Sequence, residues 1–256
     1  MIRALLVNIW KNLIEFKRYF FNSLSGILTI VIFFYLIFFG LQAVAGGTPQ
    51  FGDTIDGVIV GYFMWLMFLL SFQNVSFGII EEAQRGTLEQ VFMSPIPFEF
   101  QVFSRIVGEF LINLLLVVGL MYLAAFTTGR SLNFNLITLL YLLIVGVMSA
   151  LGVGMILGGI ALIFKRIASF IQIVTFGSLA FTMLDVTANP ILRLLPMAQT
   201  AHMMRFMTLE NYTLFSYPLM EHLYLWAASA IYLLIGITVF RSFEKRAMVT
   251  GALGQY

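Results

Sequence analysis

The stretch from residue 81 to residue 100, EEAQRGTLEQVFMSPIPFEF, holds four carboxylates and one arginine between two long runs that carry almost no charge. Glu81 and Arg85 are four residues apart, and so are Arg85 and Glu89, which is the spacing of ion pairs on one face of a helix. Each such pair stabilises a helix by only about 0.2–0.5 kcal/mol, so stability explains little of the pattern.

The same stretch predicts its own local structure. Gly86 interrupts a helix, and Ser94-Pro95-Ile96-Pro97 ends it. The result is a short amphipathic helix with exposed carboxylates and an apolar side that includes Leu88. A charged loop that only marks one side of a membrane is the alternative interpretation.

Further along the chain, Arg105, Glu109 and Asn113 recur at four-residue intervals. This spacing places them in one line on a helix, near the end of an apolar run. Ionisable residues inside a membrane span are costly, so Glu109 is a functional candidate. An ion pair between Arg105 and Glu109 at the membrane interface is one interpretation, and a gate at the inner mouth of a translocation route is the other.

A second polar line lies between residues 172 and 185. At 100° per residue, its members fall within about 140° of arc. They are Gln172, Thr175, Ser178, Thr182 and Asp185. The stripe predicts either hydrogen bonds to a neighbouring helix or one wall of a translocation route.

No residue pattern indicates catalysis or a metal site. The sequence has no cysteine, no HExxH motif, no catalytic triad pattern and no glycine-rich phosphate loop. His202 and His222 are too far apart in sequence to suggest a metal pair, and we assign them no chemistry. A net charge of +2 is too small to indicate a nucleic-acid partner.

The elements that position these residues must be membrane helices. The chain of 256 residues is 61% hydrophobic and 10% charged, whereas a soluble domain carries roughly 25% charged residues. We expect an all-α integral membrane protein, with one domain over residues 1–256 and six transmembrane helices. Charge-free intervals place the spans at 24–44, 57–80, 107–127, 136–164, 167–184 and 222–240.

Basic residues predict the orientation. With six spans both termini lie on one side, and that side then carries 11 of the 14 basic residues. The positive-inside rule therefore places both termini in the cytoplasm. Ala43-Val44-Ala45 resembles a signal-peptidase site, but the apolar run from Leu24 to Val44 is longer than the roughly 7–15 residues of a signal peptide, which predicts an uncleaved first span.

Three other segments have their own patterns. In residues 2–20 the polar side chains fall on one face of a helix and the apolar side chains on the other. This pattern predicts a helix that lies in the cytoplasmic interface. Residues 186–220 contain three prolines but are too apolar for a solvated loop, which predicts short re-entrant helices in the outer leaflet. Small residues at four-residue intervals in the fourth span predict close packing inside the subunit. They are Gly146, Ala150, Gly154 and Gly158.

Two motifs resemble the ABC type-2 exporter permeases, and the multidrug and antibiotic-export branch most of all. One is Glu82-x-x-x-Gly86-Thr87-Leu88-Glu89-Gln90 followed by Ser94-Pro95. The other is Phe243-Glu244-Lys245-Arg246 followed by Gly251-Ala252-Leu253-Gly254. The six spans, the interfacial helix and the apolar outer segment match the family too, so the resemblance covers the whole chain.

The resemblance implies a permease subunit in a prokaryotic cytoplasmic membrane, paired with a second copy or a related permease and with two separate ABC ATPase subunits. Residues 81–98 would be the coupling segment that docks on the ATPase, through Glu81, Glu82, Arg85, Gly86, Thr87, Leu88 and Glu89. ATP and Mg would be bound by that partner, and no G-x-x-x-x-G-K-[ST] motif occurs in this sequence.

The expected cargo is a drug, an antibiotic or a lipid, because charge is sparse in the spans. A polysaccharide or glycolipid exporter of the same family is the first alternative. An ion-coupled secondary transporter is the second, although all twelve carboxylates can be placed in loops or at span ends. An intramembrane enzyme or scaffold is a third class, and it lacks a catalytic constellation.

Overall fold

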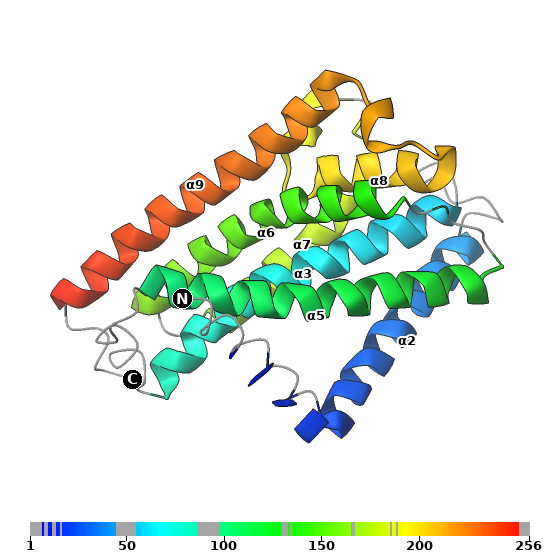
Figure 1. Cartoon of the computed structure of the whole chain (residues 1–256). Helices are drawn as coiled ribbons and strands as arrows, with labels where there is room; N and C mark the ends of the chain where they lie inside the picture. The colour runs from blue at the N-terminus through cyan, green and yellow to red at the C-terminus, as the bar shows by residue number, and fades with distance from the viewer. Residues whose placement is uncertain are drawn as a thin grey trace.

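The computed structural model describes residues 7, 10–11, 14–15, 17–44, 55–85, 98–129, 133, 135–164, 167–184, 186–187 and 189–250. Within these ranges every regular element is helical (Figure 1). In chain order they are α2 (Phe20–Val44), α3 (Ile55–Gln84), α5 (Phe98–Thr127), α6 (Leu136–Phe164), α7 (Ala168–Met183), η1 (Pro190–Leu194), α8 (Ala198–Glu210), η2 (Leu214–Ser216) and α9 (Leu219–Thr250).

The chain is a helical, multi-pass membrane protein. Among the described residues, five helices are long and apolar enough to cross a bilayer, namely α2, α3, α5, α6 and α9. The predicted span at 167–184 corresponds to α7, which has 16 residues. At ~1.5 Å per residue this helix is about 24 Å long, less than the ~30 Å of a hydrocarbon core. The sixth span therefore stays a prediction.

Helix α3 forms the centre of the bundle and contacts α5, α6, α7 and α8. Its sequence explains this position, because large apolar side chains occur on every face of the helix. Tyr62, Phe68 and Phe72 are almost completely buried. Helix α2 packs on one side of α3 through rings, with the centroids of Phe34 and Tyr62 5.3 Å apart. The Tyr62 hydroxyl also donates a hydrogen bond to the carbonyl oxygen of Ile30, at 2.8 Å.

Helix α6 packs closely on two neighbours because small residues lie on both of its sides. A Cβ added to Gly154 would lie 2.9 Å from the carbonyl oxygen of Phe72 in α3. On the other side, a Cβ at Gly152 would overlap the backbone of Tyr232 in α9. Gly146 and Gly158 similarly leave room for Thr200 and Ile79. The predicted packing inside the subunit is confirmed.

The two ends of the bundle differ. One end carries η1, α8 and η2, and we call it the α8 end (Figure 1). Nine of the 13 residues of α8 are buried there, and residues 190–216 contain three short helices, of which α8 and η1 pack on the bundle. A place in the outer leaflet stays a prediction. At the opposite end α3, α6 and α9 finish and α5 begins.

Two helices extend beyond the predicted spans at this opposite end. Glu81 and Glu82 belong to the last turn of α3, so they do not begin a separate helix at residue 81. Helix α9 continues ten residues beyond the predicted end of its span at residue 240. In both places charged residues with good helix propensity extend the apolar helix, because nothing in the local sequence stops it.

The predicted interfacial helix at 2–20 lies partly outside the described residues. Those that are described include Val7, Trp10 and Ile14, which all expose apolar side chains. The Lys11 ammonium lies 3.7 Å from the Glu15 carboxylate, one helical turn away. An exposed apolar side beside an ion pair is compatible with a helix at the membrane surface.

Candidate functional site

An arginine joins two carboxylates at the end of the bundle where α3 finishes and α5 begins. Arg105 of α5 lies 3.8 Å from Glu82 of α3 and 3.9 Å from Glu109 one turn further along α5. All three side chains are at most one-third exposed. We call these residues the Arg105 cluster.

A glycine makes room for this cluster. A Cβ at Gly78 would overlap the guanidinium of Arg105, with the Cζ atom only 2.7 Å away. Arg105 therefore lies flat against the backbone of α3, which brings it within reach of Glu82. The Arg105–Glu109 pair follows from their spacing, whereas the approach of Glu82 depends on how α3 and α5 pack, which spacing within one helix does not indicate.

Polar side chains surround Glu109 on the inner side of the cluster. Asn74 lies beside Glu109, and the two residues line the same small cavity. Ser71, Asn74, Glu109 and Asn113 line a cavity of about 10 Å³ between α3 and α5. A cavity of this size holds about one water molecule. Asn113, predicted in line with Arg105 and Glu109, thus lies beside them.

The predicted coupling segment is only partly described. Glu81 and Glu82 end α3, and Arg85 in the following turn forms an ion pair with Glu81. Glu81 and Arg85 are exposed. The remaining predicted residues, Gly86, Thr87, Leu88 and Glu89, lie outside the described residues.

The predicted stripe of α7 faces α3. Thr175, Ser178 and Thr182 are buried, whereas Gln172 is exposed. The indole N–H of Trp65 donates to the carbonyl oxygen of Thr175 at 2.9 Å. Gln73 Nε2 donates to the Thr175 hydroxyl at 3.0 Å. These are interhelical hydrogen bonds, one of the two interpretations of the stripe; a role in a translocation route stays a prediction.

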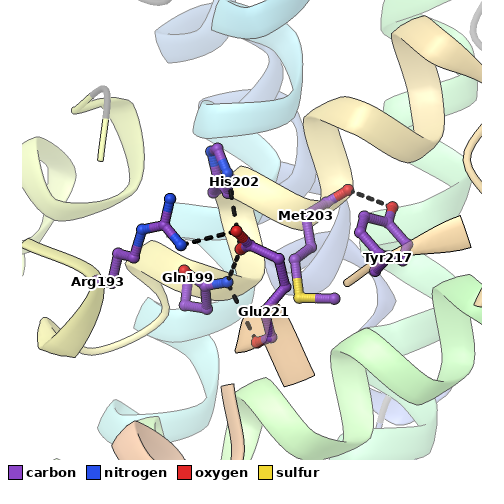
Figure 2. A network of polar contacts seen from close by, with 6 residues as sticks. All are labelled: Arg193, Gln199, His202, Met203, Tyr217 and Glu221. Atoms are coloured by element: carbon purple, nitrogen blue, oxygen red, sulfur yellow. Dashed lines mark hydrogen bonds and ion pairs between the residues drawn. The ribbon is translucent and has the colours of Figure 1, made fainter. Parts of the chain in front are cut away.

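A second polar network, which sequence reasoning missed, lies at the α8 end (Figure 2). Arg193 Nη1 donates to the Glu221 carboxylate at 2.7 Å. Gln199 Nε2 donates to the other oxygen of the same carboxylate, and His202 Nε2 lies 3.8 Å from it. One carboxylate at the start of α9 thus joins η1 and α8.

Further hydrogen bonds join neighbouring elements at the α8 end. Arg205 of α8 donates to the carbonyl oxygens of Thr182 and Leu184 at the end of α7, where helix carbonyls lack partners and attract a cation. The Tyr217 hydroxyl donates to the carbonyl oxygen of Met203 at 2.7 Å (Figure 2). Burial raises the pKa of the Tyr217 phenol, which keeps it a donor. The sequence did carry a signal for this network, because an arginine, a glutamate and a histidine occur within an otherwise apolar segment.

An apolar cavity of about 510 Å³ opens between α3, α5, α6 and α9, near the Arg105 cluster. Its lining is almost entirely aliphatic and aromatic, with Arg241 and Glu244 of α9 as its charged members. Pockets of roughly 300–1,000 Å³ bind small molecules.

The arrangement supports binding and conformational coupling. In the part of the chain that the structure describes, no three His, Cys, Asp or Glu residues are grouped so that they could hold a metal ion. No protein-family model matches the sequence, and no curated protein is detectably similar to it. The residues themselves therefore carry the functional argument.

Proposed function

We propose that this chain is the membrane subunit of an ATP-driven exporter, which moves amphipathic or apolar cargo outward with energy from separate ATPase subunits. The motif at residues 82–95 supports this proposal through its resemblance to ABC type-2 permeases. The multi-pass helical fold agrees with it. The sequence contains no phosphate-binding loop of the Walker type, so ATP and Mg would be bound by the partner.

The observation that carries the proposal is the bridge between Glu82, Arg105 and Glu109. The segment between α3 and α5 is the one that would dock on the ATPase. Arg105 ties the helix before this segment to the helix after it, at 3.8 and 3.9 Å. A displacement of the docked segment would therefore move α3 and α5 together, and α3 is the central helix of the bundle.

The complete transporter would contain two permease subunits, either two copies of this chain or one copy and a related permease, and two ATPase subunits. The bilayer is the expected environment, in the cytoplasmic membrane of a prokaryote with both termini inside. Neither a nucleic acid nor a cofactor of its own is expected for the permease.

Co-purification tests the proposal. The chain purified alone should neither bind nor hydrolyse ATP, because it lacks a phosphate-binding motif. Expressed with an ABC ATPase encoded beside its gene, it should recover that ATPase in a complex with two permease subunits. The matched variants are Glu81→Lys and Glu82→Lys, which should reach the membrane normally and recover less ATPase. ATP turnover by the isolated chain would contradict the proposal.

The variants also separate docking from the bridge. Glu81 contacts Arg85 on the exposed end of α3, whereas Glu82 contacts Arg105. We expect both reversals to weaken docking if the ATPase groove is basic, and only Glu82→Lys to lower export per bound ATPase. If both variants recover as much ATPase and export as much cargo as the unmodified chain, the segment is merely a solvated loop.

One observation favours a second candidate, an ion-coupled secondary transporter. Glu109 lies within a membrane-crossing helix, beside Asn74, Asn113 and a water-sized cavity. Carboxylates in such places serve proton relays. Cargo transport by the chain alone in proteoliposomes, driven by a pH gradient without any ATPase, would favour this candidate over the exporter.

A further inference from the structure

The apolar cavity between α5 and α9 has the size and lining of a binding site for an amphipathic small molecule. Its volume is about 510 Å³, and its walls include Val75, Phe110, Met155, Ile237 and Phe240. Burying an apolar body against such walls is favourable in proportion to the contact area, and the volume suits a drug-sized molecule.

The apolar cavity adjoins the small polar cavity beside Glu109. Four residues line both of them: Ile106, Phe110, Val147 and Leu151. On the far side of these shared walls are the carboxylate of Glu109 and the amides of Asn74 and Asn113. A ligand in the apolar cavity therefore has an acidic, hydrogen-bonding neighbourhood along one side.

The charges around this place favour a cation. Glu82, Arg105 and Glu109 form the cluster itself, and the charges of Lys11 and Glu15 also act on Glu109. Arg241 and Glu244 of α9 also line the apolar cavity. Within the Arg105 cluster itself, two carboxylates accompany one guanidinium, which is an excess of one negative charge. Interactions with that charge are stronger in a membrane-embedded site than in water, because the dielectric constant is lower.

We propose that this cavity binds lipophilic cations, with the apolar body between α5 and α9 and the positive charge on the Glu109 side. The proposal names the cargo class for the export function proposed above and rests on that function only for transport. Binding requires this chain alone, so its failure is distinguishable from a failure of ATPase coupling.

A pair of ions with nearly the same shape and opposite charge tests the proposal. Tetraphenylphosphonium and tetraphenylborate are titrated into the full chain in phosphatidylcholine nanodiscs, and specific binding is measured against protein-free nanodiscs. We expect saturable binding of the cation, at least tenfold tighter than that of the anion. Equal affinity for the two ions would overturn the assignment of charge and leave a cavity filled by lipid chains.

Two variants of the cluster should change cation affinity in opposite directions. Glu109→Gln removes the negative charge and should weaken phosphonium binding about tenfold, whereas Arg105→Gln removes the opposing positive charge and should strengthen it. If the variants act only by disrupting the Arg105–Glu109 pair, phosphonium binding should weaken in both. Weaker binding in both variants would therefore contradict the proposal. Glu210→Gln, at the exposed end of α8, removes one negative charge as Glu109→Gln does, and it should leave phosphonium binding unaltered.

A matched pair in α9 tests the location. Ile237→Trp adds bulk inside the cavity and should abolish saturable binding. Ile235→Trp makes the same substitution on the exposed side of the helix and should have no effect. Full phosphonium affinity in a folded Ile237→Trp protein would show that the cation binds elsewhere and would overturn the proposal.

Discussion

Arg105 illustrates how one missing methyl group sets a polar contact. Its guanidinium occupies the space that a Cβ at residue 78 would fill, and from there it reaches carboxylates on two helices. Since charged groups in a membrane protein pair with one another or face water, the position of this arginine defines a polar connection between α3 and α5.

The first residue-scale prediction concerns Gly78→Ala. The new methyl group should displace the Arg105 guanidinium from Glu82, while the α3 backbone stays in place because an arginine side chain is flexible. The free energy of unfolding should change by less than about 1 kcal/mol, whereas cargo-stimulated ATPase activity of the complex should fall. The measurement pairs thermal unfolding with activity at equal ATPase recovery.

Gly119→Ala is the control, because a Cβ there meets no atom within 4 Å. It should alter neither stability nor activity. Normal coupling in the Gly78→Ala complex would show that the Arg105 bridge does not link the two helices functionally.

At the scale of elements, α6 and α9 behave as one unit because glycines bring their backbones together. Gly152 of α6 and Gly236 of α9 face each other, and a Cβ on either would overlap the backbone of the other helix. Close contact between helices is a main source of stability in a membrane, where apolar side chains gain nothing by leaving lipid.

Gly152→Ala should therefore destabilise the protein by about 1–3 kcal/mol, because backbone, unlike the end of a side chain, cannot yield to the added methyl group. Thermal unfolding in detergent measures the effect. Gly26→Ala in α2 is the control, since a Cβ there lies in open space. A Gly152→Ala protein as stable as this control would mean that α6 and α9 separate easily.

The sequence predicts elements where the hydrophobic pattern and the helix ends agree. Helix α6 has the predicted bounds, 136–164, because polar residues flank an uninterrupted apolar run. Helices α3 and α9 continue past the predicted spans because charged residues can extend a helix beyond an apolar run. Contacts such as Gln73 with Thr175, or Arg193 with Glu221, join residues far apart in sequence, and a single sequence does not predict which helices become neighbours.

At the scale of the whole molecule, the Glu221 network connects the outer segment to α9. Arg193 and Glu221 are each 17% exposed, so neither charge is fully hydrated if its partner is removed. Gln199 and His202 converge on the same carboxylate. The network thus determines how η1 and α8 lie on the bundle.

A double-mutant cycle measures this connection. Arg193→Met and Glu221→Gln should each destabilise the protein by about 1–3 kcal/mol, because each leaves a partly buried charged partner. The double variant should lose less than the sum of the two, since it leaves no such charge. Thermal unfolding of the four proteins gives the coupling energy, and strictly additive losses would contradict a functional ion pair.

The same ion pair has a consequence for the order of assembly during synthesis. Arg193 leaves the ribosome 28 residues before Glu221, so the acceptor for Arg193 and Gln199 arrives only with α9. The segment with η1 and α8 should stay open to protease in a nascent chain that stops before residue 219 and become protected once α9 is inserted. Insertion of α9 would thereby complete the packing of the α8 end and report that synthesis has passed this helix.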